Sequence, residues 1–185
     1  MVVASSGTLI AVLTNPPLTD GTRTLRRVQL AAELLGFGDQ RVVNLFARPS
    51  HATGAISHLG QDETGWTEAR DALTNHLAAA DGVLLAYGCT APAGEARHHF
   101  RRQVDWLLDH SVAAAIPSWC VGDGPRHPSR WQRWTARSHP DLAFPDALRE
   151  SFTRLDFTVP WVARNRPLDP TTAPPTAAST TQKDD

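Results

Sequence analysis

Four short motifs place polar side chains where an apolar run ends or where prolines stiffen a loop. They contain Asn15 in "TNPP", Asn44 in "VVNLF", Gly88 in "LLAYG" and His127 in "GPRHPSR". An amide oxygen holds a water molecule, and a second amide matches the pairing edge of a base such as uracil, cytosine or adenine. A histidine donates a hydrogen bond to an oxygen that gains negative charge. Whether these groups act together depends on the elements that position them.

Each motif also has a structural interpretation. The segment after Asn15 suits a loop that turns into the next helix, with Asp20 or Thr22 as its cap. Asp20 is the nearest carboxylate and a conceivable general base, although capping is its more ordinary role. A lone Asn44 is typical of an amide bonded to neighbouring backbone, and His127 suits the cap of a following helix. From the residues alone, both interpretations stay open.

The elements alternate regularly along the chain. Apolar runs bounded by Gly, Pro, Asn or Asp predict buried strands at 8–14, 41–47, 82–88 and 118–122. Helical periodicity fills 22–38, 64–82 and 94–111 between them. This alternation predicts an α/β fold of three layers, α/β/α, around a mainly parallel four-stranded sheet. Apolar stripes are expected at Leu25, Val28, Ala31 or Ala32 and Leu35, and at Phe100, Val104 and Leu107 or Leu108.

A parallel sheet of this kind collects its site beyond the carboxyl ends of its strands. Asn15, Asn44 and Gly88 follow the first three predicted strands, and His127 follows the fourth. We therefore expect these residues at one edge of the sheet. The connection at 48–64 is long and rich in small and polar residues, and such connections are often functional.

A basic and aromatic segment follows His127. Arg130, Arg133 and Arg137 share one helical face, with Trp131 and Trp134 beside it. Such a segment suits a phosphate backbone and exposed bases, and Arg126 extends it upstream. Equally, the helix could pack its tryptophans in the core while its arginines face water.

Composition limits the remaining classes of protein. The chain has 185 residues, a net charge of -1 and 41% hydrophobic residues, which suits one domain and gives no global attraction to nucleic acid. We expect that domain at 1–164, and a disordered Pro/Thr/Ala-rich tail at 165–185.

Two cysteines and no membrane-spanning or leader segment predict a cytoplasmic protein. No metal or other cofactor is expected, because His98 and His99 diverge on a helix and His51 and His58 lack companions at a known spacing.

The four motifs, in this order, resemble the uracil-DNA glycosylase superfamily over residues 8–131. The segments "NPPLTDGTRTLRR", "VVNLFARP" and "GPRHPSR" more closely resemble a bacterial and phage domain family of unknown function. The glycosylase resemblance implies that Asn15 holds the attacking water, that Asn44 reads the flipped base and that His127 stabilises its departing oxygen. It also implies that Ser129 presses on the backbone, and that Pro16 and Gly88 lie at the substrate.

The resemblance has departures that bear on specificity. No aromatic residue occurs between Pro17 and Phe37 to stack on the base, so Phe46 is the substitute we expect. Arg130 and Trp131 stand where an apolar wedge would follow "HPS".

The resemblance predicts a DNA glycosylase-like hydrolase that flips and excises a modified or damaged base, with DNA or a nucleotide as partner. Arg126, Arg130 and Arg133 would then contact nucleic acid. Two alternatives stay open. The first is an inactive nucleotide or nucleic-acid binding module, which Asn rather than Asp at position 15 favours. The second is a hydrolase of free nucleosides or nucleotides, which the near-neutral charge favours.

Overall fold

The computed structural model describes residues 7–50 and 55–156. Its strands are β1 (Thr8–Leu13), β2 (Asp39–Asn44), β3 (Gly82–Leu85), β4 (Ser118–Val121) and β5 (Phe152–Arg154). Its helices are α1 (Thr22–Leu35), α2 (Ile56–Leu59), α3 (Thr64–Ala78), α4 (Ala96–Ala113), α5 (Pro128–Ser138) and α6 (Phe144–Glu150). The tail predicted at 165–185 lies outside the described residues.

The strands form one sheet in the order β2-β1-β3-β4-β5. The first four are mutually parallel, which confirms the mainly parallel α/β sheet expected from the apolar runs. The expected count of four strands is wrong, because β5 adds an antiparallel edge strand beside β4. β5 has three residues, of which Thr153 and Arg154 are exposed, so it carries no apolar run that a sequence pattern would reveal.

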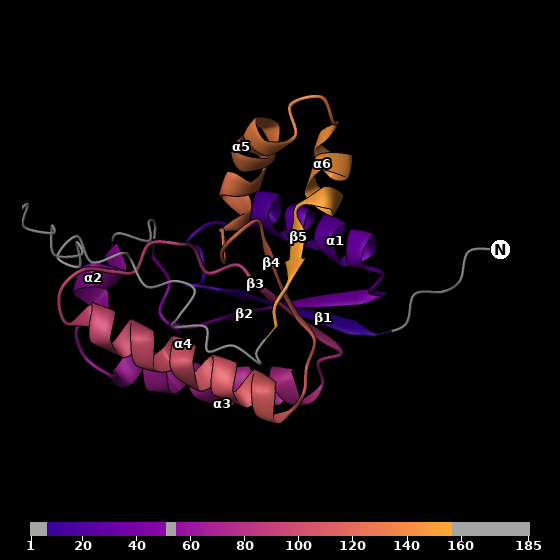
Figure 1. Cartoon of the computed structure of the whole chain (residues 1–185). Coiled ribbons are helices and arrows are strands. Elements are labelled where there is room, and N and C mark those ends of the chain that lie inside the picture. The colour runs from indigo at the N-terminus through magenta and orange to yellow at the C-terminus, as the bar shows by residue number, and fades with distance from the viewer. Residues whose placement is uncertain (1–6, 51–54, 157–185) are drawn as a thin grey trace, which may run out of the picture. The chain divides into compact units, whose positions relative to one another are not determined.

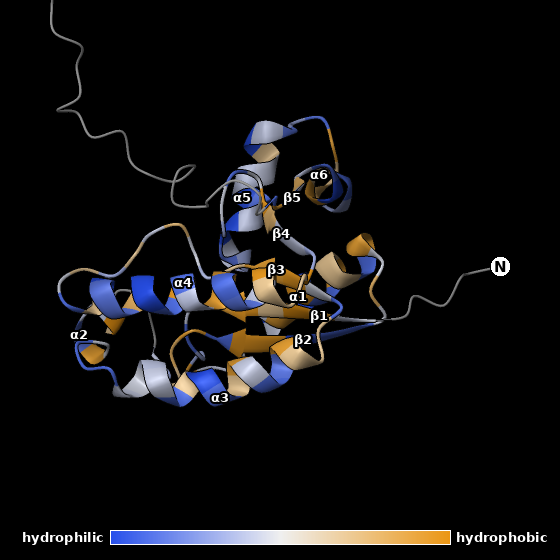
Figure 2. Ribbon diagram, turned by 60° about the horizontal axis from the view of Figure 1, so that its bottom comes forward, coloured by the Kyte–Doolittle hydropathy of each residue, from blue (hydrophilic) through white to orange (hydrophobic). Residues whose placement is uncertain are grey.

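Helices cover both faces of the sheet (Figure 1). α1, α5 and α6 lie on one face, where Val28 and Ala31 pack with Leu9 and Ala11 of β1. α3 and α4 lie on the other face, and their buried side chains include Trp66 and Leu107. The sheet between the layers is strongly apolar, whereas the outward faces of α3 and α4 are largely polar (Figure 2). Each helix therefore buries one stripe against the sheet.

Helix α1 begins where the first motif ends and stops at the expected glycine. Gly36 adopts φ 86°, and its N–H bonds the carbonyls of Ala32 and Glu33, which ends the helix. Val28, Ala31 and Ala32 are buried as expected. The expectation for Leu25 is wrong, since its side chain is 48% exposed and lines a cavity described below. None of the helices in the described part of the chain is both long and apolar enough to cross a membrane.

Candidate functional site

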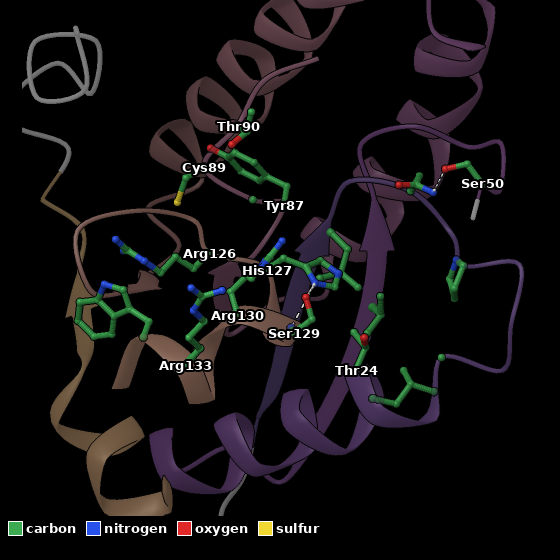
Figure 3. Close-up of a pocket in the computed structure, with 18 of the residues that line it drawn as sticks. Thr24, Ser50, Tyr87, Cys89, Thr90, Arg126, His127, Ser129, Arg130 and Arg133 are labelled. Atoms are coloured by element: carbon green, nitrogen blue, oxygen red, sulfur yellow. Dashed lines mark hydrogen bonds between the residues drawn. The ribbon is translucent and has the colours of Figure 1, made fainter. Parts of the chain in front are cut away.

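A cavity of about 780 Å³ opens beyond the carboxyl ends of β1, β3 and β4, between the first turns of α1 and α5. Its walls include most of the residues that the sequence nominated. These are Asn15, Gly88, Arg126, His127, Ser129, Arg130 and Arg133. Segments more than a hundred residues apart meet here because parallel strands direct their carboxyl ends to the same edge. Figure 3 shows Arg126, Arg130 and Arg133 on one side of His127 and Ser50 on the other.

The orientation of Asn15 is fixed by bonds to its amide nitrogen. Its Nδ2 donates to the carbonyl oxygen of Pro16 and to Oγ of Ser50, each at 2.9 Å. The preceding Thr14 hydroxyl donates to the carbonyl of Tyr87, which ties the end of β1 to the end of β3. Among the described residues, no donor bonds Asn15 Oδ1. The amide therefore presents an acceptor that suits a water molecule.

His127 is the N-cap of α5, which is the structural role that the sequence suggested for it. Its backbone is extended at φ -61° and ψ 141°, and Pro128 follows at the first helical position. Nδ1 accepts the backbone N–H of Ser129 at 3.2 Å and lies 2.9 Å from the Ser129 hydroxyl. An Nδ1 that accepts an N–H carries no proton, so the neutral ring carries its proton on Nε2.

The neutral form of His127 is favoured by its surroundings. Burial lowers the pKa of the imidazole below its ordinary value, and the positive charges of Arg130 and Arg27 lower it further. Nε2–H makes no hydrogen bond with any described residue. The cavity thus contains a neutral imidazole donor, the form that stabilises a developing oxyanion while its other nitrogen is held in place.

The loop before His127 is held rigidly by α5. The indole N–H of Trp131 donates to the carbonyl of Arg126 at 2.7 Å. Gly122 adopts φ 71°, and a Cβ there would meet Trp134 Cζ2 at 2.5 Å, so only glycine allows the loop this close to the helix. Arg27 of α1 donates to the carbonyl of Pro128 at 2.8 Å and to Gln132 Oε1 at 3.0 Å. These contacts fix the start of α5, and with it the imidazole.

The arginines of the cavity fall into two kinds. Arg126 is 19% exposed, pairs with Asp123, donates to the carbonyl of Val121 at 3.1 Å and lies 4.7 Å from the Trp134 ring centre. Its charge is thus already balanced. Arg130, Arg133 and Arg137 are exposed, and none of them forms an ion pair within the described residues. These three are the cations that remain available to a ligand.

Three of the nominated residues lie away from the cavity lining. Pro16 does not line the cavity, whereas the next residue, Pro17, does. Phe46 is completely buried, with its ring centre 4.8 Å from that of Trp66, so it presents no face on which a base could stack. Asn44 pairs in register with Leu13, which does line the cavity, but Asn44 itself is set back from it. Its Oδ1 is buried and has no partner among the described residues.

Other cavity residues were not themselves nominated from the sequence. Ser50, which holds Asn15, lies in the long connection that was singled out only for its length. Tyr87 and Cys89 flank Gly88, whose φ of 96° requires glycine. The side chain of Cys89 is exposed, yet partial desolvation raises the pKa of its thiol above the ordinary value and thereby disfavours the nucleophilic thiolate. The described residues contain no group of three His, Cys, Asp or Glu side chains placed to hold a metal ion.

The fold and the cavity define an α/β domain that carries its site at the carboxyl edge of a mainly parallel sheet. The chain belongs to the family described as protein of unknown function (DUF1643), whose model matches residues 3–129. No curated protein and no solved structure matches the chain. The matched range includes Asn15, Asn44, Gly88, His127 and Ser129, and it ends before Arg130.

Proposed function

We propose that this chain is an N-glycosidic hydrolase of the DNA glycosylase type, acting on a modified or damaged base. The observation that carries the proposal is the state of His127, a neutral imidazole whose Nδ1 is bonded, in the same cavity as Oδ1 of Asn15. Neither Nε2–H of His127 nor Oδ1 of Asn15 has a partner among the residues that the structure describes. The order of the motifs, which resembles that of the uracil-DNA glycosylase superfamily, supports the same chemistry.

In the proposed reaction, the bond between the sugar carbon C1′ and the base nitrogen breaks, and the bonding electrons leave with the base. Nε2–H of His127 donates to the base oxygen on which the negative charge collects. Asn15 Oδ1 accepts a hydrogen bond from a water molecule and directs its oxygen to C1′. The water supplies a hydroxyl to C1′, and its remaining proton ends on the departed base.

Asp20 is the sole carboxylate among the described residues that line the cavity. Its Oδ1 accepts the backbone N–H of Thr22 at 3.1 Å, so it serves the start of α1. Hydrogen bonds from the side chain of Thr22 and from its backbone N–H lower the pKa of Asp20 and make the carboxylate a weak base. The proposed reaction therefore relies on departure of the base as a stabilised anion more than on deprotonation of the water.

The unsatisfied Oδ1 of Asn44 fits a role in reading the base. A buried acceptor without a donor is costly, and such groups in native proteins call for an explanation. An N–H on the pairing edge of a bound base would satisfy it after a rotation of the side chain, because Asn44 lies beside Leu13 and two residues after Val42, both at the cavity.

The test is base release from single- and double-stranded oligonucleotides that carry uracil, hydroxymethylated or other modified bases, followed by mass spectrometry. Wild type should release at least one base, and Asn15→Ala and His127→Ala should each lower the rate by about a hundredfold or more. Asn75→Ala on α3 and His98→Ala on α4, both exposed, are the matched controls and should retain the wild-type rate. No release from any substrate would reject the proposal.

The second proposed function is a nucleotide or nucleic-acid binding module. The amide at position 15 favours it, because an amide takes no proton from water. Retention of the protein on DNA without release of any base would identify this function. A hydrolase of free nucleosides would instead release base from nucleosides, with little dependence on salt.

A further inference from the structure

Helix α5 carries a row of arginines along the cavity. Arg130, Arg133 and Arg137 all line it, all are exposed, and none forms an ion pair within the described part of the chain. Their spacing of three and four residues places them on one face of the helix. At about 1.5 Å of rise per residue, the row spans about 10 Å. A stacked nucleic-acid strand rises about 3.4 Å per nucleotide, so the row spans about three nucleotide steps.

The charge of this wall contrasts with that of the whole chain. The net charge is -1, yet the cavity brings these three arginines together with Asp20 as the single acidic residue of its described lining. Arg126 does not add to the wall, because Asp123 balances it. A local positive surface on a chain that is otherwise slightly negative directs an anionic ligand to α5.

The start of α5 offers no apolar side chain to enter a duplex. Trp131 is completely buried, Pro128 is buried, and the exposed residues of this turn are Ser129 and Arg130. Proteins that open a duplex insert an apolar wedge between base steps. Leu18 is 50% exposed but is not part of the cavity lining. Leu25 is 48% exposed and does line the cavity, but it belongs to α1 and not to the segment after "HPS" where the wedge is expected. A strand that is already unpaired needs no wedge.

We infer that Arg130, Arg133 and Arg137 bind successive phosphates of a single-stranded polynucleotide and thereby place one nucleotide between Asn15 and His127. This inference rests on the proposed function for the fate of that nucleotide, and it adds the form of the substrate and the residues that select it. The row lies beyond the residues that the family model matches, so family membership does not supply it.

The experiment measures binding by fluorescence anisotropy, with a labelled single-stranded DNA of mixed sequence and about ten nucleotides, its duplex, and a deoxynucleoside monophosphate as competitor. Wild type should prefer the single strand. Arg133→Gln combined with Arg137→Gln should weaken that binding by at least about tenfold at low salt. The slope of log affinity against log salt should flatten by about 0.7 for each arginine removed. Arg101→Gln, an exposed arginine of α4 outside the cavity, should match wild type.

The outcomes separate this inference from the proposed function. An unchanged salt slope in the double variant would overturn the phosphate row even if wild type releases a base. Tighter binding of the duplex, or a monophosphate that competes as well as the oligonucleotide, would overturn the single-stranded assignment. Loss of binding in the double variant, together with the absence of base release by wild type, would support the row and reject only the hydrolase.

Discussion

Two amide side chains on opposite faces of the sheet differ in how their buried oxygen atoms are hydrogen-bonded. On the face covered by α3 and α4, Gln103 is completely buried, and its Nε2 donates to the carbonyls of Leu45 at 3.1 Å and Trp66 at 2.9 Å. Its Oε1 accepts from Arg70 at 3.1 Å. On the face covered by α1 and α5, Asn44 has a buried Oδ1 with no partner among the described residues.

The same contrast extends to the two layers as a whole. The α3–α4 layer packs aromatic rings against each other, with Trp66 between Phe46 and Phe100, and the buried amide of Gln103 is fully paired. Within residues 7–50 and 55–156, the α1–α5 layer leaves an acceptor of Asn15 and a donor of His127 without partners at its cavity. Proteins depart from full local satisfaction mainly at functional sites. One layer thus supports the fold, and the other contains the candidate site.

The largest expected effect sharpens this contrast. Gln103→Ala removes the donor of two buried carbonyls and the partner of Arg70, and it leaves a void, so it should lower the free energy of unfolding by about 2–4 kcal/mol. Asn44→Ala removes an acceptor that has no partner and should cost less than about 1 kcal/mol. Urea unfolding followed by tryptophan fluorescence compares the two.

Each possible outcome of comparing Gln103→Ala with Asn44→Ala is informative. Equal losses would mean that Asn44 is bonded within the fold and has no capacity left for a ligand. A small loss for Asn44→Ala, combined with weaker binding of a base, would associate its unused oxygen with the cavity.

A second, smaller effect concerns pH. Because the pKa of His127 is below its ordinary value of about 6.5 in the folded state, the unfolded chain binds a proton first as pH falls. The stability that His127 contributes is present above pH 6.5 and is lost as pH falls through its lower folded-state pKa. Protonation of Nδ1 also replaces an acceptor with a donor that faces the Ser129 N–H. Between pH 7.5 and 5, His127→Ala should therefore lose less stability than wild type.

Urea midpoints measured across this range test the prediction. Asn75→Ala, which alters an exposed residue of α3 without a titratable group, should keep the wild-type dependence on pH. A His127→Ala curve parallel to that of wild type would show that the imidazole is not held neutral by its cap.

The fold was largely predictable because the parallel strands are apolar runs and the helices between them have a clear period. α6 and β5 were not predicted: α6 has seven residues, and β5 has no buried stripe. In the site, the rule for carboxyl ends correctly grouped Asn15, Gly88 and His127, since topology alone brings them to one edge.

The direction of the Phe46 side chain could not be predicted from the sequence pattern. Its ring fills the space above Gly65 of α3, where a Cβ would meet Phe46 Cε2 at 2.3 Å. The direction of the ring depends on Gly65, which lies nineteen residues later on a helix of the α3–α4 layer. No local period in the sequence encodes that contact. The hydrogen bond from Asn15 to Ser50 is a similar case, because it joins two loops whose approach depends on the whole sheet.

The smallest expected effect separates two neighbouring arginines of α5. The charge of Arg130 lowers the pKa of His127, whereas Arg133 is not among the groups that shift it. Arg130→Gln should therefore raise the midpoint of the His127 ring signal in an NMR titration, and Arg133→Gln should leave it in place.

The difference should shrink in about 1 M salt, where the screening length falls to about 3 Å. Burial remains the largest cause, so the midpoint in Arg130→Gln should stay below the ordinary value of about 6.5 for histidine. Equal shifts in both variants would mean that α5 acts on the imidazole as a diffuse positive field. Arg130 would then have no effect on the imidazole that distinguishes it from Arg133.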